Sequence, residues 1–175
     1  PRDAFVSVNC PDFKSLPDGA IVGTSSLRRQ CQLLAMRPDL HIKLLRGNVN
    51  TRINKLTNGE YDAIILAAAG LIRLDMQDKI KHCFNIEEIL PATGQGALGI
   101  ELRSDDSHMF DLIKVLNHDE TRIALTAERA VNAKLNGSCQ VPIGAHAQVN
   151  DNHIKLMALI ADPSSNEILY AQHSG

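Results

Sequence analysis

The residues best suited to chemistry lie in segment 137–144, Gly-Ser-Cys-Gln-Val-Pro-Ile-Gly, which contains Cys139. This cysteine follows the expected end of a helix, lies between two glycines and precedes Pro142 by three residues. Glycine and proline at these positions favour a short, bent and accessible loop. A thiol on such a loop can act as a nucleophile or a covalent anchor, although most cysteines are small buried hydrophobes. We therefore single out Cys139 from the other three cysteines, which have no comparable setting.

A second candidate feature is a run of arginines between residues 21 and 60. This segment holds seven basic and two acidic residues, a net charge of +5, which leaves −7 for the rest of a chain whose total is −2. Five of the seven basic residues are arginines, whose planar fork matches carboxylate or phosphate. The segment thus indicates a small anionic ligand, the alternative being a solvated basic face. Nucleic acid is disfavoured, because the whole chain is acidic and aromatic residues, with no Trp, make up 3%.

The predicted elements position these arginines. Strands alternate with helices, in the order strand 20–23, helix 27–37, strand 42–45, helix 49–57 and strand 63–69, which Gly70 ends. Such alternation predicts a parallel or mixed sheet with both faces covered. Ligands of these sheets bind beyond the carboxyl ends of the strands. The polar residues that follow a strand end, and should therefore meet at one edge, are Thr24, Ser25, Ser26, Arg28, Arg46 and Arg73. The hydroxyl residues could equally serve as helix N-caps.

The organisation changes after residue 90. Residues 90–97, rich in Gly and small side chains, are typical of a crossing between domains. We expect a strand at 98–102, an amphipathic helix over 109–116 and a second helix from about 121 to 135, capped by Asn136-Gly137. Three strands at 145–149, 153–160 and 167–172 should form an antiparallel meander.

Other classes are disfavoured by what the sequence lacks. No apolar run approaches the ~20 residues that span a membrane, and the first residues show no secretion leader. The cysteines form no CxxC pair, which argues against zinc and against a disulfide framework. We expect a cytoplasmic protein without a metal site.

Five segments together resemble the porphobilinogen deaminase family. They are 23–30 (Gly-Thr-Ser-Ser-Leu-Arg-Arg-Gln), 45–52 (Leu-Arg-Gly-Asn-Val-Asn-Thr-Arg), 62–67, 94–97 (Gly-Gln-Gly-Ala) and 137–144. They occur in the family's order and extend over nearly the whole chain, so the resemblance is specific even though each segment alone would be weak evidence.

The resemblance implies a fold and a division into domains. The fold is α/β: a lobe like those of periplasmic binding proteins, with a mixed or parallel sheet and flanking helices, followed by a small α+β domain with a three-stranded antiparallel sheet. Residues 1–90 would form the second, central domain, 91–117 would cross and return to the first domain, and 118–175 would begin the third. The family's first domain, with an acidic residue that assists the chemistry, would lie upstream of Pro1. No catalytic residue is therefore expected in this segment, which alone should be inactive.

The family's activity follows from the same resemblance. Its members are transferases that join four porphobilinogen molecules head to tail, with loss of ammonia, into hydroxymethylbilane. The chain grows on a dipyrromethane cofactor, which Cys139 would hold through a thioether. The implied partners are porphobilinogen, the growing pyrrole chain and the missing N-terminal part, with no nucleic acid, membrane or metal, and the complete protein would be a monomer.

The resemblance also assigns site residues. Those implied to hold the cofactor are Thr24, Ser25, Ser26, Arg28, Arg29, Arg46, Gly47, Asn48 and Arg52, besides Cys139. Those implied to bind the substrate are Arg46, Arg52, Arg73 and Gln95. Arg37 and Lys43 match no such position and are taken as surface charges.

A second hypothesis keeps the anion site but not the enzyme. The same sheet and arginine turns would suit a non-enzymatic anion-binding lobe of a two-domain binding or effector-sensing protein. Such a protein would not need an exposed loop cysteine on a further unit.

Overall fold

The structure, a computed structural model, describes residues 1–138, 141–151, 153–165 and 167–175. Its first part is a five-stranded mixed sheet in the order β3-β2-β4-β1-β5. The strands are β1 (Asp3–Ser7), β2 (Ile21–Gly23), β3 (His41–Lys43), β4 (Ala63–Ala67) and β5 (His82–Cys83). Strand β2 is parallel to β3 and β4, whereas β1 is antiparallel to β4 and β5. This arrangement confirms the predicted mixed sheet.

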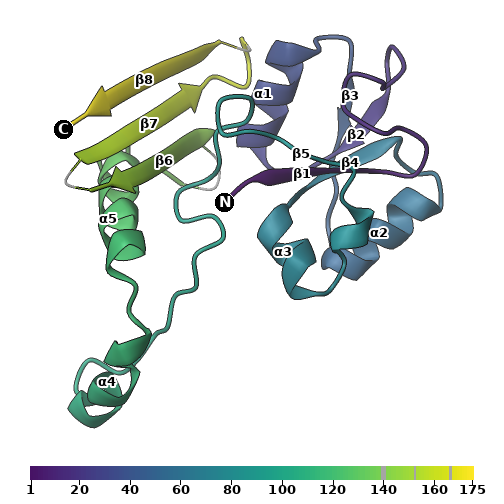
Figure 1. Ribbon diagram of the computed structural model, residues 1–175. Helices are drawn as coiled ribbons and strands as arrows, with labels where there is room; N and C mark the ends of the chain where they lie inside the picture. The colour runs from purple at the N-terminus through teal and green to yellow at the C-terminus, as the bar shows by residue number, and fades with distance from the viewer. Residues whose placement is uncertain (139–140, 152, 166) are drawn as a thin grey trace.

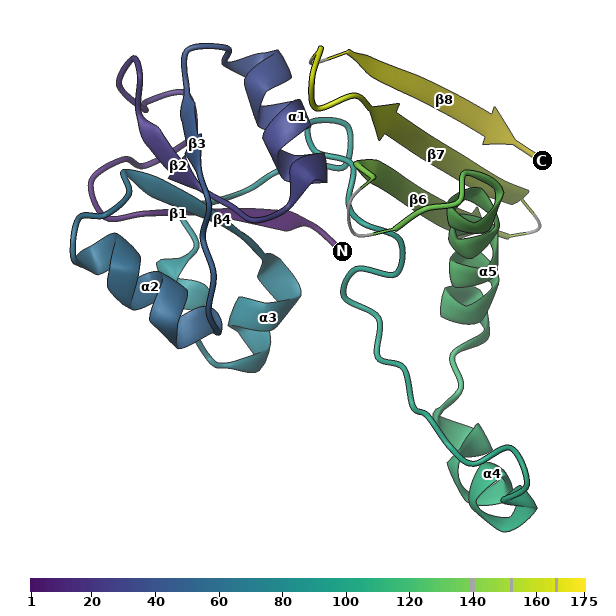
Figure 2. The same ribbon diagram turned by 180° about the vertical axis from the view of Figure 1, so that it is seen from behind.

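Helices cover both faces of this sheet (Figures 1 and 2). They are α1 (Leu27–Met36), α2 (Val49–Thr57) and α3 (Ala68–Arg73), with a 3-10 turn η1 (Gln77–Lys79). Side chains alternate across the central strand β4, as the two-residue period of a strand requires. Ile65 packs with Leu33 of α1, and Ile64 packs with Ile53 and Leu56 of α2. The two layers bury the sheet and fix the ends of β2, β3 and β4.

The second part is a smaller α+β unit. Strands β6 (Ile143–Asn150), β7 (His153–Ala161) and β8 (Ile168–Ser174) form an antiparallel sheet in that order, which confirms the predicted meander. Helix α5 (Asp119–Lys134) packs against this sheet (Figure 1). A small core of Leu90, Met157 and Leu159 joins the unit to the end of the first part.

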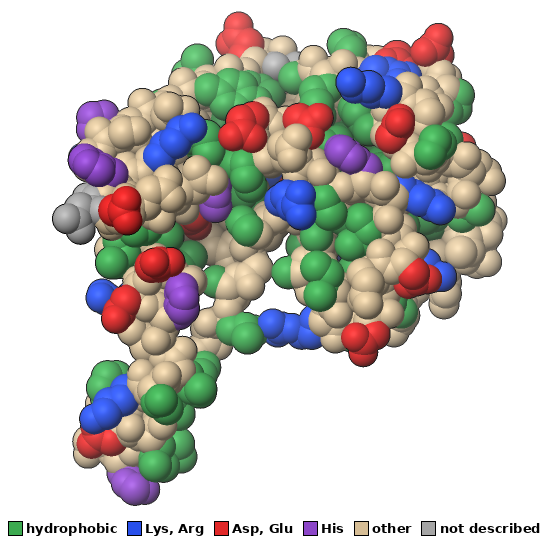
Figure 3. Space-filling model, viewed as in Figure 1, with side chains coloured by type: hydrophobic (Ala, Val, Ile, Leu, Met, Phe, Trp, Pro, Cys, Tyr) green, Lys and Arg blue, Asp and Glu red, His purple; other side chains and the backbone are tan. Residues whose placement is uncertain are grey.

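An extended arm connects the two parts. It carries α4 (Ser107–Ile113) and the 3-10 turn η2 (Lys114–Leu116), and both views show it projecting from the rest of the molecule (Figures 1 and 2). Hydrophobic side chains lie among charged ones on its surface (Figure 3), and Phe110, Val115 and Leu116 are exposed. The expected domain boundaries at 90 and 117 stay predictions.

Two expected elements differ in the structure. Strand β4 ends at Ala67, and Gly70 lies inside α3, because an alanine-rich run favours helix directly after the strand. Residues 98–102 form no strand; in the described part of the chain no neighbouring strand supplies them with a hydrogen-bonding partner. The predicted cap signal at Asn136-Gly137 is confirmed, because Asn136 takes the left-handed conformation after α5, with a φ of 50°.

Among the described residues no helix is long and apolar enough to span a membrane. In the same residues no group of His, Cys, Asp or Glu side chains is placed to hold a metal ion.

Candidate functional site

A cavity of about 580 Å³ lies where the first part meets the second. One wall is the turn between β2 and α1, and the other is α5 with the segment that follows it. The lining residues are Ser25, Ser26, Leu27, Arg28, Ala92, Thr93, Arg129, Asn132, Gly137, Ser138, Val141 and Ile143. The two features singled out from the sequence, the hydroxyl turn and the cysteine segment, thus border one cavity. Cys139 itself lies outside the described residues, between lining residues Ser138 and Val141.

The hydroxyl turn begins helix α1. Ser26 is the N-cap, and its hydroxyl accepts the backbone N–H of Arg29 at 3.4 Å. The buried Thr24 hydroxyl accepts the N–H of Ser26 at 3.2 Å. Ser25 is exposed at the cavity. The turn therefore serves as a helix cap and also presents hydroxyls beside the helix N-terminus, where an anion is favoured.

Arg28 is the most enclosed arginine of the site, with 4% of its surface exposed. Its guanidinium donates to the carbonyl of Leu90 at 2.6 Å and to Oε1 of Gln95 at 3.2 Å, and lies 2.9 Å from Oδ2 of Asp3. Burial lowers the pKa of Arg28, and the positive charge of Arg29 adds to this, while Asp3 opposes it. Most of the N–H donors of the Arg28 guanidinium therefore already interact with groups of the protein.

Arg29 and Gln95 share the carboxylate of Asp3. Arg29 donates to Oδ1 of Asp3 from Nε at 3.0 Å and from Nη2 at 2.6 Å, and to the carbonyl of Ile65 at 3.3 Å. The Gln95 amide donates to the same Oδ1 at 3.0 Å and to the Pro1 carbonyl at 2.6 Å. Asp3 is fully buried at the centre of this network. The structure thus brings three predicted site residues together around an acidic residue that the sequence analysis missed.

The second turn, between β3 and α2, holds three further predicted residues, and a fourth, Arg52, follows within α2. Asn48 caps α2 by accepting the N–H of Thr51 at 2.8 Å. Gly47 has a φ of 119°, and a Cβ there would lie 2.7 Å from the Thr51 side chain, so only glycine fits. Arg52 donates from Nε to the Gly47 carbonyl at 2.7 Å. Burial lowers the pKa of Arg52, and the charge of Arg29 contributes, which indicates that the two guanidinium groups are close.

Arg46 and Arg73 differ from the other arginines because both are exposed. Within the described part of the chain neither forms a hydrogen bond or ion pair, so their forks face solvent. Arg37 is not a simple surface charge, because Asp39 accepts two bonds from it at 2.7 Å and Asp18 lies 3.5 Å away.

Helix α5 adds two cavity residues that were not predicted, Arg129 and Asn132. They are three residues apart and so share one helix face. A Cβ on Gly137 would overlap the amide group of Asn132, so this glycine allows the chain to fold closely back on the helix. The sequence could have indicated these two residues, because an arginine and an asparagine stand just upstream of the cysteine segment.

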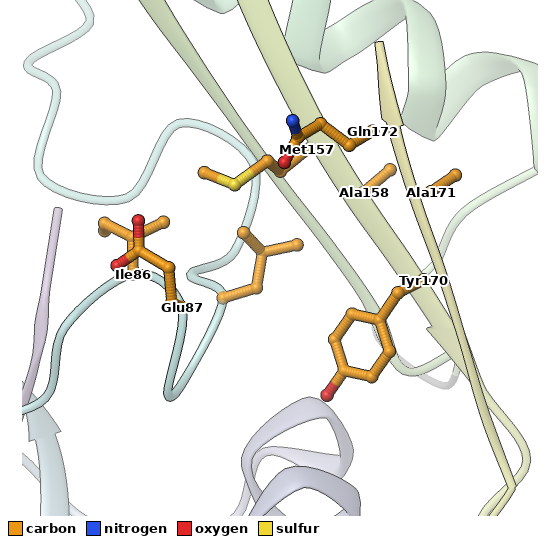
Figure 4. A pocket seen from close by; sticks show the side chains of 8 residues that line it. Ile86, Glu87, Met157, Ala158, Tyr170, Ala171 and Gln172 are labelled. Atoms are coloured by element: carbon orange, nitrogen blue, oxygen red, sulfur yellow. The ribbon is translucent and has the colours of Figure 1, made fainter.

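A smaller cavity of about 270 Å³ separates residues 86–90 from strands β7 and β8. Figure 4 shows Ile86, Met157 and Tyr170 around it, from both parts of the molecule. It contains none of the predicted site residues.

The fold and the larger cavity define an α/β protein with an arginine-lined cavity shared between two units. The chain matches two family descriptions, "Porphobilinogen deaminase, dipyromethane cofactor binding domain" over residues 1–111 and "Porphobilinogen deaminase, C-terminal domain" over residues 122–174. It therefore belongs to the porphobilinogen deaminase family, whose members are transferases of tetrapyrrole biosynthesis.

Among solved structures, the chain is similar to a lipoprotein from Bacillus subtilis whose name describes it as methionine-binding. The sequence identity is 15% and the TM-score is 0.44, with 69% of this chain and 59% of the lipoprotein covered.

Proposed function

We propose that this chain provides the cofactor and substrate cleft of a hydroxymethylbilane synthase, which joins four porphobilinogen molecules head to tail into a linear tetrapyrrole. The observation that carries the proposal is the shared cavity. It brings Ser25, Ser26 and Arg28 to the segment that contains Cys139. A non-enzymatic anion-binding lobe would need the wall formed by the turn between β2 and α1, but not the wall formed by α5 and the cysteine segment.

The residues present suit a dipyrromethane held at Cys139 through a thioether. Porphobilinogen units carry acetate and propionate side chains, so the cofactor is a polyanion, and guanidinium forks and hydroxyls are the donors that carboxylates prefer. Ser25, Ser26, Arg28 and Arg129 line the cavity with hydroxyl groups and positive charge. When bound, the cofactor supplies the pyrrole carbon on which the chain is extended.

Substrate carboxylates would bind to the arginines whose forks remain available. Arg46 and Arg73 are exposed, and within the described residues Arg52 donates from Nε alone. Gln95 would act from inside the Asp3 network rather than by direct contact, because its amide already bonds to Arg28, Asp3 and Pro1. Arginine charge does not change over the working pH range, so the positive charge that binds the carboxylates of each added pyrrole stays constant.

Each cycle breaks the aminomethyl C–N bond of one porphobilinogen, releases ammonia and forms a C–C bond to the growing chain, whose terminal ring loses a proton. Water releases the product after four additions. The described residues contribute positioning and charge stabilisation. Asp3 is not assigned to proton transfer, because two arginines hold it as a buried carboxylate.

We also propose a cytoplasmic protein that acts as a monomer. The described cysteines Cys10, Cys31 and Cys83 are free thiols, which a reducing compartment preserves.

The test is turnover by the full-length protein. Purified protein is incubated with porphobilinogen, and the linear tetrapyrrole and released ammonia are measured together. We expect four ammonia molecules per tetrapyrrole. Binding of porphobilinogen without ammonia release would contradict the proposal and favour the anion-binding lobe.

A further inference from the structure

Residues 90–95, which leave the first sheet, are bonded to α1 on one side. The N–H of Leu90 donates to Oε1 of Gln32 at 2.7 Å, and Nε2 of Gln32 donates back to the Leu90 carbonyl at 3.2 Å. The same carbonyl accepts the bond from Arg28. The beginning of the crossing is thus fixed to the helix that carries the arginines.

Glu128 of α5 holds the other side of the same segment. Its Oε2 accepts the N–H of Gly94 at 2.7 Å, and its Oε1 accepts the N–H of Ala147 in β6 at 3.0 Å. Nδ1 of His146 lies 3.3 Å from Oε1. Only 5% of Glu128 is exposed. One buried carboxylate therefore connects three segments: the crossing, helix α5 and the second sheet.

Burial alone would raise the pKa of Glu128. The nearby His146 ring and the hydrogen bonds from Gly94 and Ala147 outweigh burial, and the pKa of Glu128 lies below its ordinary value. The group is therefore a carboxylate at neutral pH, and bonds from N–H donors to a charged acceptor are stronger than neutral ones.

The neighbours of these bonds belong to the cavity. Gly94 precedes Gln95, which bonds to Arg28 and Asp3. Glu128 precedes Arg129, and α5 leads to Gly137 and Ser138 in the opposite wall. Shifting the bond between Gly94 and Glu128 would thus move one wall relative to the other.

We infer that Glu128 is a positioning residue, which sets the distance between the arginine network and the cysteine-bearing segment without touching the ligand. The inference rests on the proposed function for its kinetic consequence. It goes beyond that function in assigning a role to a side chain that lies outside the cavity lining.

The variant Glu128→Gln tests this inference in the full-length protein. A carboxamide of the same shape has one acceptor oxygen, so it can accept from Gly94 or from Ala147 but turns an NH₂ group toward the other donor. Misplacement of reacting groups by about 1 Å can cost roughly 100-fold in rate. We expect kcat to fall by about 10- to 100-fold, with KM within about threefold of wild type. Glu128→Asp, which keeps the charge on a shorter side chain, should recover part of the loss.

Glu120→Gln is the matched control, because it removes the same charge from an exposed position in the first turn of the same helix. It should leave kcat unchanged. Amide hydrogen exchange supplies a second readout: Glu128→Gln should speed exchange at Gly94, Ala147, Gly137 and Ser138, and the control should not.

The two readouts separate the possible failures. Wild-type kcat in Glu128→Gln, or a raised KM with unchanged kcat, would overturn the positioning role. So would a lowered melting temperature with normal kcat well below that temperature, because Glu128 would then only stabilise the fold. If wild type made no tetrapyrrole but amide exchange in Glu128→Gln rose as stated, the proposed function would fail. The role of Glu128 in positioning the two cavity walls would still be supported.

Discussion

At the scale of single residues, Asp3 organises the candidate site. Arg28 and Arg29 are adjacent in the first turn of α1, where their positive charges repel each other. The buried carboxylate of Asp3 bonds to Arg29 and lies 2.9 Å from Arg28, so it neutralises part of this charge. The field that reaches the cavity is therefore set by arginines held in fixed orientations.

Replacing Asp3 should destabilise the protein strongly. Asp3→Asn leaves buried arginine charge without its counter-ion, and removing one partner of a buried pair costs about 3–5 kcal/mol. Urea unfolding should show a loss of about 3 kcal/mol. Asp105→Asn, an exposed aspartate on the arm, is the control and should unfold like wild type. Equal stabilities of the two variants would contradict the role given to Asp3.

Arg46 should act on the ligand rather than on stability. It is exposed and unpaired within the described residues, so Arg46→Lys keeps the charge and loses only the bidentate fork. A hydrogen bond to a charged group is worth about 1.5–3 kcal/mol, so kcat/KM should fall by about 10-fold or more, with an unchanged melting temperature. Native mass spectrometry should show stalling at a particular pyrrole chain length. Arg122→Lys on the exposed face of α5 is the control, and the same pattern in both variants would refute the assignment.

Residue types and spacing could predict only part of this site. The hydroxyl turn and Arg28 were predicted, because a strand end followed by a helix start is local in sequence, whereas Arg29 was assigned only through the family resemblance. Asp3 could not be predicted, because its partners Arg29 and Gln95 are 26 and 92 residues away. Arg129 and Asn132 were missed for the same reason, since only the packing of α5 brings them to the cavity.

At the scale of elements, the periodic segments were predicted well. Helices α1 and α2 and the meander of β6, β7 and β8 have caps, spacing and turns that agree with one another. Strand β1 was not predicted, because an aspartate stands in an otherwise apolar run and is satisfied only by tertiary contacts. The 98–102 segment has a strand-like composition, but pairing decides whether a strand forms.

The close fit between α5 and the segment after it gives a prediction at this scale. Gly137→Ala places a methyl group on the amide of Asn132, so the chain must move away from the helix. We expect less dipyrromethane attached in the full-length protein, measured as the modified fraction of the purified protein. Gly99→Ala, where nothing lies within 4 Å of the added carbon, is the control. Full attachment in Gly137→Ala would show that the close approach does not position the cysteine segment.

At the scale of the whole molecule, a small apolar core and the hydrogen bonds of the Glu128 carboxylate join the two parts, so their coupling should depend partly on pH. The pKa of Glu128 is lower in the folded protein than its ordinary value of 4.5. Its contribution to stability is then fully present above about pH 4.5 and is lost as the pH falls through the lower, folded value.

The direction of this pKa shift predicts a measurable difference in stability between variants. The free energy of unfolding of wild type should exceed that of Glu128→Gln at pH 7, and the difference should shrink steadily below pH 4.5. Glu120→Gln should stay close to wild type throughout. A difference that is constant down to pH 3 would show that the carboxylate charge is not what holds the two parts together.

The central claim is that the arginine-lined cavity encloses a cofactor bound covalently at Cys139. Peptide mass mapping of the full-length protein tests this claim most directly. The peptide with Cys139 should carry two pyrrole units in wild type and in Cys10→Ser, and none in Cys139→Ser, because a hydroxyl is a far weaker nucleophile than a thiolate at neutral pH. An unmodified Cys139 in active protein, or a normal load of cofactor in Cys139→Ser, would contradict the account.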